Sequence, residues 1–164
     1  MTAQQKIAPC LWFDKQALEA AEFYVSAFPD SRIDNVIRSG VDWPAGEAGD
    51  VIFVEFTLSG VAHQALNGGA NQPFTEAISL SVTCEDQAEI DRLWAALTDG
   101  GGEPIQCGWL KDRFGLRWQI VPASHQRMMR EGNDEQLARL MAAMMNMVKF
   151  DVAALEAVFE GKEK

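Results

Sequence analysis

Long apolar runs are absent from this sequence, and no segment approaches the roughly 20 residues that a membrane-spanning helix requires. Residues 1–6 also lack the apolar stretch of a signal peptide. We therefore expect a cytoplasmic protein with no membrane partner. Clustered basic residues are absent too, because the 14 Lys and Arg are scattered among 24 Asp and Glu, for a net charge of −10. Since phosphate binding requires a clustered basic face, we expect no nucleic acid partner.

Cysteine and histidine are scarce. The three cysteines lie too far apart for a Cys-x-x-Cys metal or redox pair, and their odd number gives no disulfide framework. Cys10 and Cys84 are expected to be small buried hydrophobic side chains. Cys107 could be an exposed nucleophile in a turn, but no histidine nearby in sequence would activate it, so packing is favoured for all three. Of the two histidines, His125 is expected to face solvent.

What the sequence does contain is a β-hairpin pattern at residues 107–122. Asp112 can hydrogen-bond the backbone ahead of it and Gly115 can adopt positive φ, as a tight turn requires. The flanking residues are aromatic, β-branched or apolar, and Pro122 ends the second strand because it has no N–H. Alternation predicts two faces, one with Leu116, Trp118 and Ile120 and the other with Arg117, Gln119 and Val121.

Up to the end of this hairpin, the sequence pattern predicts two units with the same order of elements: a strand, a helix and three strands. The elements predicted for the first unit are residues 7–13, 17–28, 32–38, 51–58 and 61–67. Those predicted for the second unit are a strand at 77–83, a helix that opens at 85–86 and closes before 100–102, and strands near 103–106, 108–111 and 117–121. Residues 40–50 are expected to form a loop, and Glu55 is expected on the wetter face of its strand.

After residue 122 the pattern becomes helical. One apolar stripe comprises Leu137, Leu140, Met141, Met144, Met145 and Val148, and a shorter one comprises Val152, Leu155 and Phe159. The methionines are expected to pack on the sheet or on a second copy of the chain. The alternative is that they form an adaptable wall over a ligand cavity.

Several motifs resemble the vicinal-oxygen-chelate superfamily of glyoxalases, bleomycin-resistance proteins and dioxygenases, in its PhnB-like branch, which carries a 3-demethylubiquinone methyltransferase label. The motifs are Leu11-Trp12-Phe13-Asp14, Ala20-Ala21-Glu22-Phe23-Tyr24, Leu66-Asn67-Gly68-Gly69, Cys84-Glu85-Asp86 and the hairpin at 107–122. The resemblance implies an α+β fold in which two βαβββ modules form a curved mixed sheet. It also implies a homodimer. Within a single domain, 1–164, we expect module one at about 5–70, module two at about 75–122 and a C-terminal helical extension at about 123–160.

Enzymes of this superfamily hold a divalent ion with His and Glu side chains from the first, fourth, fifth and eighth strands. The matching positions here hold Ile7 or Pro9, His63, Ala77 and Gln119. The His63 imidazole and the Gln119 amide together do not make a catalytic zinc or iron site. We therefore expect no bound metal. S-adenosylmethionine commonly binds at a glycine-rich turn between a strand and a helix. The glycine clusters at 67–70 and 100–102 do not lie in such a turn, so we expect no cofactor.

These observations predict a protein that binds a small aromatic or planar metabolite in the cavity of its concave sheet. The residues predicted to line it are the aromatic Trp12, Phe53, Trp109 and Trp118 and the polar His63, Asn67, Asp112, Arg117 and Gln119. No catalytic residue is assigned. One alternative is an enzyme: a metal-dependent lyase, isomerase or dioxygenase, or the methyltransferase of the family label. Another is a protein that acts through its dimer surface, with side chains filling the cavity.

Overall fold

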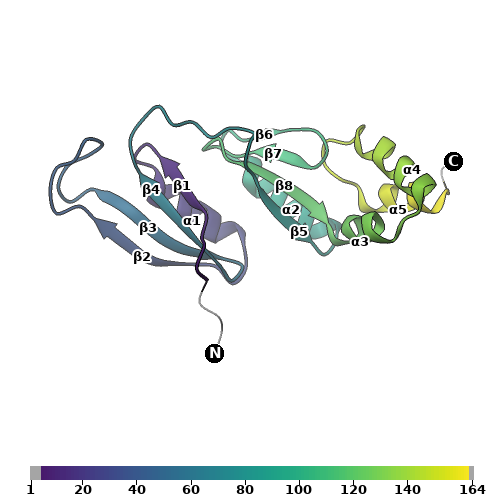
Figure 1. The fold of residues 1–164 in the computed structure, drawn as a ribbon, viewed down its shortest axis with the longest axis horizontal. Helices are drawn as coiled ribbons and strands as arrows, with labels where there is room; N and C mark the ends of the chain where they lie inside the picture. Colours follow the sequence, from purple (N-terminus) through teal and green to yellow (C-terminus); the bar gives the residue numbers. More distant parts are fainter. Residues whose placement is uncertain (1–4, 163–164) are drawn as a thin grey trace. The chain divides into compact units, whose positions relative to one another are not determined.

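The computed structural model describes residues 5–162 and divides into two compact units, Met1–Pro73 and Phe74–Lys164. Each unit contains one βαβββ module with its own four-stranded mixed sheet, and helices follow the second module (Figure 1). The predicted α+β class, the two modules and the C-terminal helices are therefore confirmed.

The first module comprises β1 (Cys10–Phe13), α1 (Ala17–Ala27), β2 (Arg32–Arg38), β3 (Val51–Leu58) and β4 (Val61–Asn67). Its strand order is β1-β4-β3-β2, with β1 parallel to β4 and the other pairs antiparallel. Helix α1 packs on the sheet through fully buried Ala17, Ala20, Ala21 and Tyr24. The small alanines let the helix backbone approach the strands closely.

The second module repeats this arrangement with β5 (Leu80–Cys84), α2 (Gln87–Thr98), β6 (Glu103–Pro104), β7 (Trp109–Lys111) and β8 (Arg117–Pro122). The strand order is β5-β8-β7-β6, and β5 is parallel to β8. Asp86 caps α2, because its side chain accepts a hydrogen bond from the Glu89 backbone N–H. The strand predicted at 77–83 begins only at Leu80, the first residue that pairs with β8.

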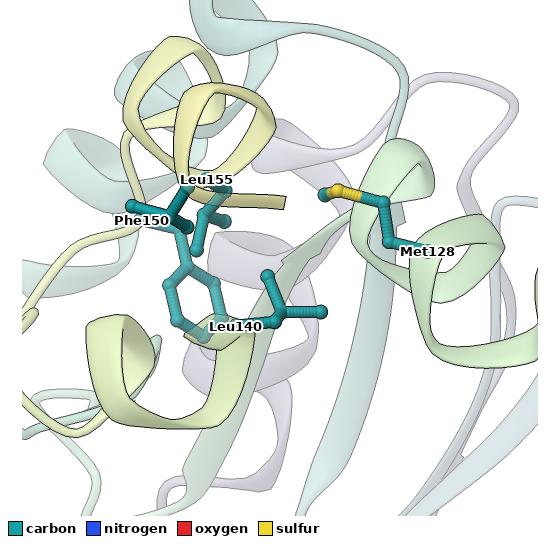
Figure 2. Packing of buried hydrophobic residues seen from close by; sticks show 5 residues of the cluster. Met128, Leu140, Phe150 and Leu155 are labelled. Carbon is teal, nitrogen blue, oxygen red and sulfur yellow. The ribbon is translucent and has the colours of Figure 1, made fainter. Parts of the chain in front are cut away.

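The extension folds into α3 (Ala123–Glu131), α4 (Asp134–Met144) and α5 (Val152–Glu160). Buried residues from all three helices join Phe150 in a hydrophobic cluster: Met128 from α3, Leu140 from α4, and Leu155 and Val158 from α5 (Figure 2). The stripe predicted to run to Val148 is helical only to Met144. The chain leaves the helix there because Met147 and Val148 carbonyls accept hydrogen bonds from the Cys107 and Gly108 backbone N–H groups, both 2.8 Å.

Within residues 5–162, none of these helices has the length and apolar character needed to cross a bilayer.

Candidate functional site

The turn between β7 and β8 is held by a buried carboxylate. Asp112 Oδ2 accepts a hydrogen bond from Trp118 Nε1 (2.8 Å), and its Oδ1 accepts from the backbone N–H groups of Phe114 (2.9 Å) and Leu116 (3.0 Å). Gly115 supplies the positive φ that closes the turn. Asp112 and Trp118 are both buried. Two of the predicted ligand-binding residues therefore have a structural role on the side of the sheet that packs against α2.

The opposite face of this sheet, here called the second open face, consists of Trp109, Lys111, Arg117 and Gln119. All four are half-buried, and alternation on β8 matches the two faces predicted from the sequence. The strand register sets Trp109 beside Gln119 and Lys111 beside Arg117. Gln119 Nε2 donates to Ser79 Oγ (2.9 Å), which fixes the amide.

Arg117 has an unused donor on this face. Its Nη1 donates to the Gly115 carbonyl (3.3 Å), and its Nη2 pairs with exposed Glu76 (3.5 Å). The Nε–H is buried and has no hydrogen-bond partner in the described part of the chain. Because a buried donor without an acceptor costs free energy, this group favours an additional oxygen acceptor at the site.

The first module also has an open face away from α1, which comprises Trp12, Phe53, Glu55, Gln64 and Leu66. The register places Leu66 next to both Trp12 and Phe53, and Gln64 next to Glu55. Trp12 donates from Nε1 to the Gly69 carbonyl (2.9 Å) and remains 38% exposed. The result is an apolar end beside a polar end on one surface. Glu55 lies on this less buried face together with Phe53, so the choice between the wetter face and the predicted cavity stays open.

His63 and Asn67 lie on the other side of the first sheet, beneath α1. The His63 ring stacks on Phe56, with ring centroids 5.5 Å apart. Asn67 Oδ1 accepts from the Ala17 backbone N–H (2.8 Å) at the start of α1, and its Nδ2 donates to the Val51 carbonyl (2.8 Å). Asn67 therefore helps to hold the start of α1 on the sheet, and His63 stacks on Phe56, whose ring in turn stacks on Tyr24 of α1.

The structure thus groups five of the nine predicted residues on open faces, Trp12 and Phe53 in the first unit and Trp109, Arg117 and Gln119 in the second. The other four, His63, Asn67, Asp112 and Trp118, are buried on the helix-covered sides. Ligand contact by any of the nine stays a prediction.

Sequence reasoning missed a cavity of about 340 Å³ on the first unit. It is lined by Lys15, Leu18, Trp43, Ala45, Asp50, Val51 and Asn67. Trp43 Nε1 is buried without a hydrogen-bond partner among residues 5–162. Asn67 was predicted as a ligand-binding residue, but Trp43 lies inside a loop of turn formers, which periodicity does not register.

The strand positions implied to hold a metal do not fit a divalent ion. Ile7 and Ala77 precede their strands and are exposed, and neither they nor Pro9 has a side-chain donor atom. His63 lies beneath α1, and the Gln119 amide is bound to Ser79. No three His, Cys, Asp or Glu side chains of the described residues gather as a ligand set. No reaction step through such an ion is derived, and the lack of a metal stays a prediction.

The two residues whose environments were predicted wrongly are Cys10 and His125. Cys10 is exposed rather than buried, because it lies on the face of β1 away from α1. His125 is half-buried rather than solvent-facing, since its ring stacks on Phe150 (5.6 Å between centroids), and burial lowers its pKa. Cys84 is buried as expected, and burial raises the pKa of its thiol to about 12.

Comparisons with known proteins agree with this architecture. Residues 5–121 match the 3-demethylubiquinone-9 3-methyltransferase family. A putative 3-demethylubiquinone-9 3-methyltransferase, PhnB protein, from Bacillus cereus is 36% identical, with a TM-score of 0.66, over 73% of this chain and 100% of that chain. Protein PA1353 from Pseudomonas aeruginosa is 22% identical, with a TM-score of 0.60, over 73% of this chain and 98% of that chain. No curated protein matches.

The chain belongs to the 3-demethylubiquinone-9 3-methyltransferase, or PhnB-like, family. The matched region ends at residue 121, so α3, α4 and α5 lie outside it.

Proposed function

We propose that this PhnB-like protein binds a small planar or aromatic metabolite that carries a carboxylate or carbonyl oxygen. The observation that supports the proposal is the buried, unpartnered Nε–H of Arg117 on the second open face, next to the half-buried Trp109 and Gln119 pair. Small-molecule sites combine mostly apolar walls with a few fixed polar groups, as this face does.

Each residue has a separate role in this proposal. The flat indole of Trp109 stacks on the planar ligand, an arrangement that adds to simple burial of apolar area. Arg117 donates from its free Nε–H to the ligand oxygen, and the charge of the guanidinium strengthens that hydrogen bond. Gln119, held by Ser79, presents its amide oxygen to a donor on the ligand.

The test is binding of matched probes by isothermal titration calorimetry. 4-Hydroxybenzoate is expected to bind more tightly than neutral 4-hydroxybenzamide, because only the first offers a carboxylate. Arg117→Gln is expected to weaken 4-hydroxybenzoate binding by at least about tenfold, since a hydrogen bond to a charged group contributes about 1.5 to 3 kcal/mol. Trp109→Ala is expected to weaken both probes.

Lys111→Gln is the matched control, because Lys111 lies beside Arg117 on the same face and is paired with Glu103. An equal loss in Lys111→Gln would show that charge alone attracts the probe. Unchanged binding in Arg117→Gln would contradict the proposal. Loss of binding in Trp43→Ala alone would place the ligand in the cavity of the first unit instead.

Trp12 and Phe53 enter the proposal as apolar contacts for a planar ligand on the first open face, as a separate binding surface of the first unit. Phe53→Ala is expected to weaken probe binding at this surface without changing the preference for the carboxylate, because no charged hydrogen bond is removed. Retention of full affinity in this variant would exclude the first open face as a binding surface.

A homodimer and a cytoplasmic location also belong to the proposal. Exposed Met141 and Val148 on the extension provide apolar surface for a second copy. Sedimentation at micromolar concentration is expected to show a dimer. A monomer would contradict this part of the proposal and leave the ligand site unaffected.

A further inference from the structure

Four side chains with soft or borderline donor atoms meet where the extension joins the second module. Cys107 Sγ lies 3.9 Å from Met145 Sδ. His125 Nε2 lies 2.9 Å from Met144 Sδ. Met144 is the last residue of α4 and Met145 is its C-cap, so the two contacts lie at the same end of this helix.

The backbone fixes this neighbourhood from both sides. The segment after α4 is bound to the turn before β7, since the Cys107 and Gly108 N–H groups donate to Met147 and Val148 carbonyls. The buried ring of Phe150 packs against Gly108 on this turn and stacks on His125. The histidine and the cysteine therefore approach α4 around one aromatic ring.

Cys107 is held in an unusual conformation. Its φ is +59°, in the left-handed region that residues other than glycine seldom occupy. Such backbone strain is concentrated at functional sites. The Cys107 Sγ also lies 3.5 Å from the Met144 carbonyl, which directs the thiol toward the methionines.

We propose that Cys107, His125, Met144 and Met145 form a binding site for one soft monovalent metal ion, Cu(I) or Ag(I). Thiolate and thioether sulfur select Cu(I) over hard divalent ions, and imidazole is also a copper ligand. On binding, the Cys107 thiol releases its proton to solvent and the sulfur bonds the ion, with no change of oxidation state.

The distances suit such an ion. Two sulfur atoms 3.9 Å apart can share an ion about 2.3 Å from each, a usual metal–thiolate distance, with an angle of about 115° at the metal. His125 Nε2 and Met144 Sδ lie 2.9 Å apart, so these two atoms must separate by about half an ångström for both to bind the same ion. The unbranched methionine side chain can make that movement. Met145 is 60% exposed, which leaves a path for the ion.

The test is titration of the full chain with Ag(I), followed by calorimetry and native mass spectrometry. The background carries Cys10→Ser, because the exposed Cys10 thiol would itself bind the ion, whereas Cys84 is buried. One Ag(I) per chain is expected. Adding Cys107→Ser is expected to weaken Ag(I) binding by at least about 100-fold. Removing a group that only hydrogen-bonds a metal ligand already costs about 10 to 100-fold in metal affinity, and Cys107 is proposed as a direct ligand.

Met144→Leu and Met145→Leu keep the side-chain volume and remove the sulfur, and each is expected to weaken binding by about tenfold. Met141→Leu, one turn earlier on α4 and also exposed, is the matched control and is expected to have no effect. Circular dichroism of each variant establishes that it is folded. The proposal is overturned if the Cys10→Ser protein binds no Ag(I), if Cys107→Ser binds as tightly, or if the folded Met144→Leu and Met145→Leu variants behave as Met141→Leu does.

Discussion

Asp112 serves three donors from one buried carboxylate, and the turn before β8 depends on it. Asp112→Ala removes the carboxylate that accepts from the Trp118 indole and from two backbone N–H groups, and a buried donor that loses its acceptor costs about 1 to 3 kcal/mol. We expect a loss of about 3 kcal/mol in the free energy of unfolding, measured by urea denaturation. Asp99→Ala is the control, because this exposed carboxylate forms a surface ion pair with Arg113. A loss no larger than that of the control would contradict the structural role.

The cysteines differ in their accessibility to alkylation. The pKa of Cys84 is raised to about 12 by burial first and by Glu89 second, so almost no thiolate is present at pH 8. Iodoacetamide at pH 8 is expected to label exposed Cys10 in the native protein and Cys84 only in denaturant, as read by peptide mass spectrometry. Burial raises the pKa of Cys10 as well, so its labelling is expected to accelerate as the pH rises. Native labelling of Cys84 at the rate of Cys10 would show that the second module opens readily.

For individual residues, the alternation of side chains along a strand was the only reliable basis for predicting the face on which each one lies. The two faces of β8 follow from period two alone, and they are correct from Arg117 to Pro122. Alternation does not say which face a helix covers. Trp118, predicted to contact a ligand, is buried on the α2 side, and its ligand contact stays a prediction. His125 was misplaced for a related reason: the aromatic ring that covers it, Phe150, comes 25 residues later and reaches it only through tertiary packing.

Among the turns that join the elements, the one before β7 depends on Gly108, which combines positive φ with a close contact. Its φ is +78°, and a Cβ there would lie 2.4 Å from the Phe150 ring and 3.0 Å from the Ile120 carbonyl. Gly108→Ala combines left-handed strain with overpacking, and we expect a loss of about 2 to 4 kcal/mol by urea denaturation. Gly115→Ala separates the two contributions, because Gly115 has φ +92° and a Cβ added there would meet no atom within 4 Å. Its expected cost is about 1 kcal/mol. Equal losses in both variants would exclude the clash.

Element order followed from the sequence, and element ends did not. The helical stripe through Met144 continues to Val148 in the sequence, yet the helix stops because the next carbonyls bond the turn at 107–108. That competition between a local and a long-range hydrogen bond is invisible to periodicity. The strand expected from residue 77 is shortened for a similar reason, since pairing with β8 starts at Leu80.

At the scale of the whole molecule, two repeats of one topology were predictable from a repeated pattern, whereas the attachment of the extension was not. The family match ends at residue 121, and the Bacillus cereus relative is covered completely by 73% of this chain. The modules are thus the shared part. The extension adds a cluster around Phe150, which packs on Gly108 of the second module.

If the extension and the second module form one cooperative structure, loss of Phe150 affects both. Phe150→Ala is expected to cost about 3 to 5 kcal/mol, as large-to-small changes in a core do. Hydrogen exchange is expected to show faster exchange in α3, α4 and α5 and also at the Cys107 and Gly108 amides, which donate to the segment before Phe150. Protection in β1 to β4 is expected to stay unchanged, because those strands belong to the other compact unit. Val61→Ala, at an exposed position on β4, controls for the general effect of a smaller side chain. Faster exchange confined to α5 would mean that the last helix opens alone and that the turn carrying Cys107 is held without it.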